Sequence, residues 1–243
     1  MKPTIKPLMT LLVLIQLNSI QAQSWFSSGI GGSGNKTTQM IQTEDYDIIQ
    51  AHGPIEIHLK KGKEGEIAVT TSDNLHQYLE VESNNNRLEI RLKKGVSIKR
   101  NGNFELSIPF ESISKVSLSG SGVIDTEDPI SGSLDISLSG SGNIDLKLDT
   151  EKVGTQISGA GNIKFSGTSK DSNLSISGSA NYNGLELETQ NTSIEISGSG
   201  RAKVNASESL KARISGSGSV QYKGKPDKVN TNISGSGSVK TID

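Results

Sequence analysis

The sequence contains no cysteine, three histidines and only 4% aromatic residues. A chain without cysteine forms no disulfide framework, no thiolate-ligated zinc site and no lipid-modified cysteine. Its 25 basic and 26 acidic residues give a formal net charge of -1, so it lacks the basic excess of proteins that bind nucleic acid or anionic lipid. The composition therefore excludes a disulfide-stapled scaffold and predicts no nucleic-acid partner.

Long hydrophobic runs are also scarce, and the clearest one lies at the N-terminus. Leu8 to Leu17 form an apolar run that follows Lys2 and Lys6 and precedes the small residue Ala22. This is the pattern of a secretory signal peptide, whereas a membrane-spanning helix needs about 20 apolar residues. We predict a signal peptide at residues 1–22 and hence a secreted, periplasmic or cell-envelope protein that does not insert in the membrane after cleavage. An uncleaved N-terminal anchor is the alternative.

The segment after the signal is polar and glycine-rich. Residues 23–36 are predicted to form a flexible Gly/Ser linker. Trp25 and Phe26 within it are interpreted as a remnant beside the cleavage site, and a docking anchor is the less favoured interpretation.

A single β domain is predicted over residues 37–243. In its irregular N-terminal part, residues 37–114, aliphatic and polar residues alternate with period two, as in IEIHLK from Ile55. This alternation is typical of strands with one buried and one wet face. Asp73 is expected to cap a short helical turn over residues 74–79.

Glycine, with 27 copies, recurs at a fixed spacing in the regular part of this domain, residues 115–243. An S-G-S-G core appears there in seven copies, two of them as the variants S-G-A-G and S-G-S-A, with a period of about 19 residues. Such self-similarity is the signature of a stacked repeat protein. The first glycines of the seven copies are Gly120, Gly140, Gly159, Gly178, Gly198, Gly216 and Gly235.

Two sets of positions keep their chemistry in every copy. The residue two before the first glycine is aliphatic: Leu118, Leu138, Ile157, Ile176, Ile196, Ile214 and Ile233. The residue one before it is serine: Ser119, Ser139, Ser158, Ser177, Ser197, Ser215 and Ser234. In an extended chain these two sets point to opposite faces.

The repeat predicts an all-β fold, a single-stranded parallel β-helix (solenoid) of about seven coils. Each coil is a strand, a narrow glycine corner, a second strand and a polar turn, and like positions stack about 4.8 Å apart. A sandwich or propeller of antiparallel hairpins is disfavoured because glycine and isoleucine in register at this period suit parallel coils. The last coil would leave an unpaired edge, from which we expect a homo-oligomer.

The order of motifs along the chain resembles a known family. Tyr46-Asp47-Ile48-Ile49, GPIEIHLKKG, Asp73-Asn74-Leu75, RLEIRLKKG and the S-G-S-G coils follow one another as in the bacterial putative auto-transporter adhesin, head GIN domain family. The resemblance covers residues 37–243, with one departure: Gly53-Pro54-Ile55 stand at the position of the naming motif. It implies a secreted single-stranded parallel β-helix without established enzymatic activity.

Motifs for catalysis, cofactors or metals are missing from the sequence. His52, His58 and His76 lack metal-ligand spacing, and all three precede the repeat serines, so neither a zinc site nor a hydrolase triad is indicated. The S-G-S-G strings lack the helix that follows a phosphate-binding loop.

Asp125 and Asp145 form the strongest catalytic candidate, because they share a coil position and could act as stacked acid/base carboxylates or bind calcium. The same position continues as Lys164, Asn183, Lys203, Gln221 and Lys240, which indicates a solvated ladder of mixed charge. We therefore predict no catalytic, cofactor-binding or metal-binding residue and no cofactor.

A secreted or cell-surface, non-enzymatic, adhesin-like binding module is the function that these patterns favour. The serine column would present a regular hydroxyl surface to a glycan or a cell-surface protein, although the sequence assigns no individual ligand-binding residue. A carbohydrate-active lyase or hydrolase using Asp125 and Asp145 is the alternative. A hydroxyl lattice that binds ice is a third, weaker hypothesis.

Overall fold

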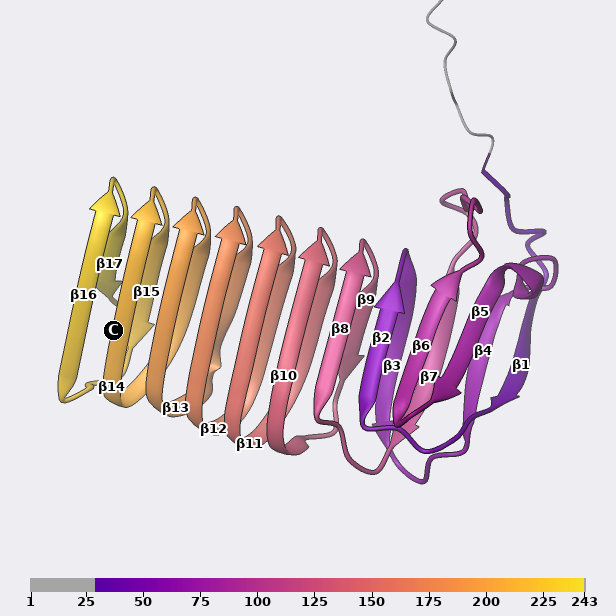
Figure 1. Cartoon of the computed structure of the whole chain (residues 1–243), viewed down its shortest axis with the longest axis horizontal. Coiled ribbons are helices and arrows are strands. Elements are labelled where there is room, and N and C mark those ends of the chain that lie inside the picture. The colour runs from indigo at the N-terminus through magenta and orange to yellow at the C-terminus, as the bar shows by residue number, and fades with distance from the viewer. Residues whose placement is uncertain (1–28, 243) are drawn as a thin grey trace, which may run out of the picture.

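The repeats form long strands that wind into stacked parallel coils (Figure 1). The computed structural model describes residues 29–242. The first nine strands are β1 (Lys36–Gln42), β2 (Ile48–His52), β3 (Ile55–Lys61), β4 (Glu66–Ser72), β5 (Leu79–Asn84), β6 (Arg87–Leu92), β7 (Phe104–Phe110), β8 (Lys115–Gly120) and β9 (Val123–Thr126). The later strands are β10 (Ile130–Gly140), β11 (Asn143–Gly159), β12 (Asn162–Gly178), β13 (Asn181–Gly198), β14 (Arg201–Gly216), β15 (Ser219–Lys223), β16 (Lys228–Gly235) and β17 (Ser238–Thr241).

Each regular coil has two walls joined by a tight corner. The segments that end at the corner glycines form the wall that faces the viewer in Figure 1, called here the front wall, and the segments that follow the corners form the back wall. Strands β11 to β14 run down the back wall of one coil and up the front wall of the next, and neighbours pair in parallel throughout. The predicted parallel solenoid of about seven coils is therefore confirmed.

Glycine is required at the corners for two reasons, which Gly178 illustrates. Its φ of +119° lies where side-chain-bearing residues are strained. A Cβ atom at this position would also approach the carbonyl oxygen of Gly159, in the coil before, to 2.5 Å. Gly53 belongs to Gly53-Pro54-Ile55, the segment that differs from the family's naming motif. It has a φ of +107° and donates its N–H to the Ser119 carbonyl, so it extends the column of corner glycines by one coil.

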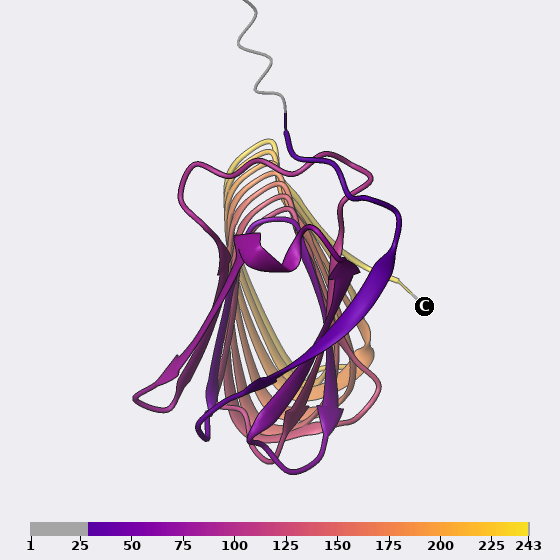
Figure 2. The ribbon, with the colours of Figure 1, turned by 90° about the vertical axis from the view of Figure 1, so that its right-hand side faces the viewer.

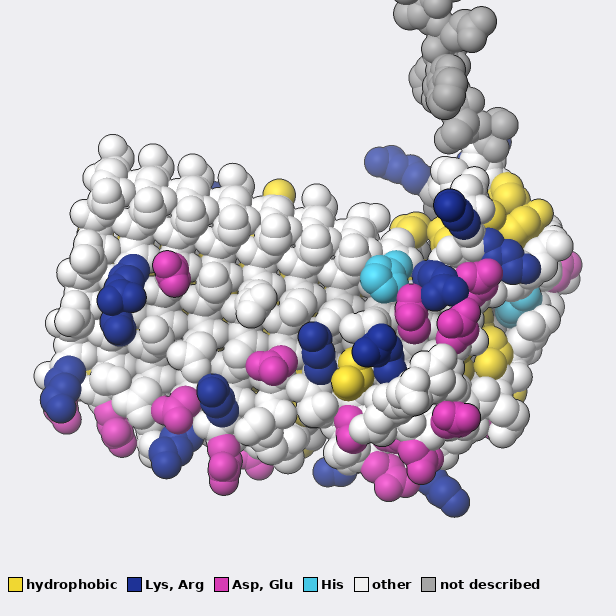
Figure 3. Space-filling view, viewed as in Figure 1, with side chains coloured by type: hydrophobic (Ala, Val, Ile, Leu, Met, Phe, Trp, Pro, Cys, Tyr) yellow, Lys and Arg dark blue, Asp and Glu magenta, His cyan; other side chains and the backbone are white. Residues whose placement is uncertain are grey.

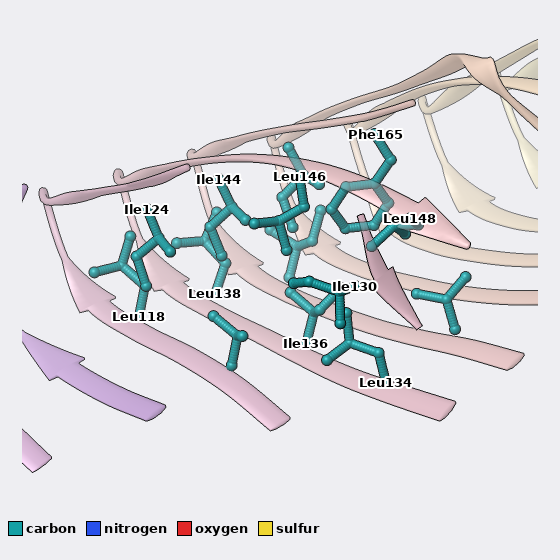
Figure 4. Close-up of a cluster of buried hydrophobic side chains, with 14 of the residues drawn as sticks. Leu118, Ile124, Ile130, Leu134, Ile136, Leu138, Ile144, Leu146, Leu148 and Phe165 are labelled. Atoms are coloured by element: carbon teal, nitrogen blue, oxygen red, sulfur yellow. The ribbon is translucent and has the colours of Figure 1, made fainter. Parts of the chain in front are cut away.

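The space between the walls is filled by aliphatic columns (Figure 4). Leu118 and Leu138 of the front wall and Ile124 and Ile144 of the back wall are no more than 1% exposed. Outside the core, the Asn143, Asn162 and Asn181 side chains hydrogen-bond one another from coil to coil at 2.9 and 3.0 Å. Apolar burial and backbone ladders thus hold the stack, and amide ladders of this kind add to it.

The N-terminal end departs from sequential winding. Strands β2 and β3 form a coil that pairs directly with β8 and β9. The later strands β6 and β7 stack on the outer side of that coil. Three antiparallel strands complete this end, β5 on β6 and β4 and β1 beyond β7.

A short 3-10 helix, η1 (His76–Tyr78), lies across the N-terminal opening of the solenoid (Figure 2). The helical turn expected here is present, but its predicted cap is wrong. Leu75 occupies the cap position without a side-chain hydrogen bond, because the Asp73 carboxylate instead accepts hydrogen bonds from Ser33 Oγ and Asn35 Nδ2. Asp73 therefore holds the segment that precedes β1 in place and does not cap the helix. Residues 29–242 contain no helix with the length and hydrophobicity of a membrane span.

A buried tyrosine makes the stability of the regular coils depend on pH. Tyr182 is 3% exposed and packs edge-on against Phe165, with ring centroids 5.6 Å apart. Burial raises the pKa of its hydroxyl above the ordinary 10.0, so the folded state is favoured while the hydroxyl is neutral. This contribution is complete below pH 10 and is lost as the pH rises above it.

We expect the free energy of unfolding of the Tyr182→Phe variant to fall less steeply than that of the wild type between about pH 9 and 12. Urea titrations at several pH values measure both slopes. Equal slopes would show that the Tyr182 hydroxyl does not contribute to alkaline unfolding.

Candidate ligand-binding surface

The outer face of the front wall carries columns of side chains that run along the solenoid, because like positions of successive coils are in register. The uppermost is the predicted serine column, and the strand register places its seven members side by side from Ser119 to Ser234. All of them except Ser119, which is half-buried, are exposed. The column continues at its N-terminal end with His52, the register partner of Ser119.

The middle of this wall carries few charges (Figure 3). Charged side chains gather along its lower rim and near the N-terminal end, and a few lie toward the C-terminal end. The wall therefore offers mainly hydroxyl and amide groups, with alternate core-facing residues holding its strands flat against the aliphatic columns.

A shallow hollow of about 380 Å³ interrupts the lower half of the wall. It is centred on Gly154 of β11, whose register partners are Asp135 in the preceding coil and Asn173 in the following one. Gln156 and Ser175 line its upper side. Lys115 and Glu195 lie at its ends. Carboxylate, carboxamide and hydroxyl groups and one ammonium group thus line one open depression.

The hollow exists because Gly154 has no side chain in a column where other coils carry lysine, aspartate, asparagine or serine. Unlike the corner glycines, Gly154 has no positive φ, so its backbone does not demand glycine. An added Cβ would meet only the Asp135 carboxylate, with Oδ1 at 2.6 Å. Sequence reasoning missed this feature, because one glycine of 27 is conspicuous only after the strands are aligned.

The acidic pair lies on the opposite wall, and the structure places it as the sequence indicated. Asp125 and Asp145 are direct register partners, and the column continues through Lys164 and Asn183. Each carboxylate has a cationic or imidazole neighbour on its outer side: His58 Nδ1 lies 2.9 Å from Asp125 Oδ1, and Lys164 Nζ lies 3.6 Å from Asp145 Oδ2. The pair is thus part of a ladder of alternating groups.

His58 is a member of this ladder that sequence reasoning missed. It precedes the repeats, so its alignment with Asp125 depends on β3 pairing with β9, which no spacing in the sequence reveals. The surface around His58, Asp125 and Asp145 is a broad, open depression. Within residues 29–242, no group of three or more histidine, aspartate or glutamate side chains is placed to hold a metal ion.

The three histidines lie apart. His52 faces outward on the front wall, 3.9 Å from a Glu89 oxygen, and His58 lies on the back wall. His76, in η1, contacts the Thr37 hydroxyl at 2.9 Å. Trp25, Phe26 and the predicted signal segment 1–22 lie outside the described residues.

The fold has close relatives among solved structures. A putative adhesin from Bacteroides fragilis superposes with a TM-score of 0.82 at 24% identity, over 88% of this chain and all of its own. A putative lipid binding protein from Parabacteroides distasonis gives 0.73 at 24% identity, over 88% and 99%. A putative adhesin from the same organism gives 0.72 at 26% identity, over 88% and 100%. These likenesses establish a common fold.

Comparison with curated proteins finds no match. The sequence profile of one family, however, matches residues 45–226, which include the N-terminal coil of β2 and β3 and most of the S-G-S-G coils. The match spans about three quarters of the sequence, in the region where the motifs follow the family's order. The chain therefore belongs to the putative auto-transporter adhesin, head GIN domain family.

Proposed function

We propose that this protein is a secreted or cell-surface, non-enzymatic, adhesin-like module that binds a glycan in the hollow over Gly154. Family membership and adhesin-named structural neighbours support an adhesive role. The predicted signal peptide supports a location outside the cytoplasm. The observation that carries the choice of surface is the convergence of Asp135, Asn173 and Gln156 on one depression of a weakly charged wall.

The chemistry of this depression suits a carbohydrate. Sugar hydroxyls both donate and accept hydrogen bonds. Carboxylate and carboxamide groups together supply the acceptors and donors that such hydroxyls need. The Asp135 carboxylate accepts only, while Asn173 and Gln156 each offer an acceptor and two donor hydrogens. An open, shallow site suits a sugar within a longer chain better than a small molecule that must be enclosed.

The serine column extends this surface along the solenoid. Successive hydroxyls lie about 4.8 Å apart, the spacing of neighbouring strands. A glycan seated over Gly154 can therefore make further hydrogen bonds to serines of the same and adjacent coils. Because no aromatic platform lines the hollow, we expect each sugar to bind weakly and an extended glycan to bind more tightly.

Filling the hollow tests this proposal. A Gly154→Thr variant places a side chain where the sugar would sit, and the backbone at this position accepts it. We expect at least about a tenfold loss of affinity, or 1.4 kcal/mol, for the glycan that binds the wild type best in an immobilised panel. Calorimetric titration measures the dissociation constants.

A matched control is Gln221→Thr, which introduces the same residue on the back wall. It should leave both affinity and melting temperature unchanged. An unaltered affinity in Gly154→Thr with a loss in Gln221→Thr would move the site to the back wall. Turnover of a glycan that depends on Asp145 would instead favour the lyase or hydrolase alternative.

A further inference from the structure

The C-terminal end of the solenoid exposes a strand edge that has no partner in the described chain. Strand β16 pairs with β14 along one side only, and β17 pairs only with β15. Unpaired edges of this kind are templates for pairing with another strand.

The interior of the solenoid is also open at this end. Val229 and Ile233 of β16 are 46% and 41% exposed. Their register partners one coil earlier, Leu210 and Ile214, are 1% and 2% exposed. The aliphatic columns thus continue into the last coil and lack their final covering layer.

The opposite end is closed, and this limits which partner can cover the open one. Antiparallel strands β1 and β5 form its two edges, and η1 lies across the opening between the walls. Because η1 covers the core at that end, head-to-tail stacking would not bury Val229 and Ile233 against a second open core. A tail-to-tail contact brings two open cores together and covers these residues in both copies.

The free backbone groups of β16 have a definite pattern. In the parallel ladder, a residue that lies an odd number of positions from its corner glycine hydrogen-bonds through its N–H and C=O to the preceding coil. Asp135, five positions before Gly140, shows this by donating its N–H to the Ser114 carbonyl. By the same alternation, the N–H and C=O groups of Val229, Thr231 and Ile233 face away from β14. Outward-facing groups therefore belong to the same residues whose side chains face the open core.

We propose that two copies of this chain pair β16 against β16, antiparallel, about a two-fold axis at Thr231. In this register Val229 of each copy lies opposite Ile233 of the other, and the two Thr231 residues face each other. The backbone N–H and C=O groups of Val229, Thr231 and Ile233 then lie opposite backbone groups of the other copy that are also free. Each of these pairs can therefore exchange backbone hydrogen bonds.

The side chains agree with this register. On the inner face the exposed aliphatic residues cover one another, and threonine pairs are favourable cross-strand neighbours. On the outer face Asn230 lies opposite Asn232, and Lys228 lies opposite Ser234, so no like charges oppose each other within the β16 pair. The interface is isologous and closed, which limits the assembly to a dimer.

The first test is the mass of the mature chain by light scattering and sedimentation over a concentration series. We expect a dimer for the wild type and a monomer for Thr231→Pro. Proline at this position removes an outward-facing N–H and leaves the bonds to β14 intact, since edge strands accept proline where the N–H faces solvent. The dissociation constant should rise at least about a hundredfold, which corresponds to 2.7 kcal/mol.

Two further variants keep the test independent of folding. Met40→Lys alters an exposed hydrophobic residue of β1 at the other end and should remain dimeric. Thr231→Cys introduces the sole cysteine of the chain, and a short bis-maleimide should link two copies of it. A wild-type monomer at about 100 μM, a Thr231→Pro dimer with unchanged affinity, or open-ended polymers would each overturn the proposal.

Discussion

Replacement of Phe165 by alanine is expected to lower the free energy of unfolding by about 3–5 kcal/mol. Phe165 is fully buried, it lies beside Leu146 and Leu148 in the core (Figure 4), and its ring meets Tyr182 edge-on. Backbone hydrogen bonds join each coil to the coil before and the coil after it. The two walls therefore cannot move together to fill the cavity that the ring would leave. The loss is a large part of the roughly 5–15 kcal/mol that stabilises a typical domain.

Urea denaturation followed by circular dichroism measures this effect. Lys147→Ala serves as the control, because Lys147 is an exposed residue of the same wall, and its replacement should change stability by no more than about 0.5 kcal/mol. A Phe165→Ala variant as stable as this control would mean that the interior is not packed as described.

Replacement of Gly178 by alanine is the second large effect, expected at about 2–6 kcal/mol. The strain of a side chain at its positive φ costs about 1–3 kcal/mol. Overlap of the new methyl group with the Gly159 carbonyl oxygen adds about 1–3 kcal/mol. Each corner glycine packs against the backbone of the corner glycine in the coil before it. A shift that relieved the overlap in one coil would therefore require the neighbouring coils to shift as well.

Gly154→Ala is the matched control for this prediction. It adds the same methyl group to a glycine of the same solenoid, but at an unstrained φ and against a movable carboxylate. We expect it to be neutral or to stabilise by about 0.4–1 kcal/mol, since it reduces the freedom of the unfolded chain. Equal destabilisation by the two variants would contradict the assignment of the corners.

The regular coils are predictable from sequence because one physical constraint repeats. Each corner needs glycine, each inward position before it needs an aliphatic residue, and the period fixes which residues stack. Residues as far apart as Leu118 and Ile214 can therefore be assigned to one column from the repeat length alone.

The N-terminal part could not be predicted to the same degree. Alternation of Ile55, Ile57 and Leu59 identifies a strand with one buried face, but it does not say which strand lies beside it. The structure inserts β2 and β3 between later segments, and without a repeat length no sequence spacing specifies that order. The β5–β6 hairpin also escaped notice, although Asn85 and Asn86, with φ of 49° and 63°, form the kind of turn that asparagine favours.

The candidate site divides along the same line. The serine column and the Asp125–Asp145 pair follow from the period and lie where the sequence indicated. The hollow over Gly154 and the His58–Asp125 contact depend on cross-strand register and on the absence of a side chain. Such features are properties of the assembled wall, and they become visible only when neighbouring coils are placed side by side.

The claim that a glycan binds in the hollow over Gly154 is tested most directly by NMR. The glycan that binds best is titrated into isotope-labelled protein, and the changes in backbone amide chemical shift are mapped onto the structure. We expect the largest changes at Asp135, Gly154 and Asn173, with smaller ones along the serine column and none at Asp125 or Asp145. Changes confined to the back wall around His58 and Asp145 would contradict the assignment of the front wall as the binding surface.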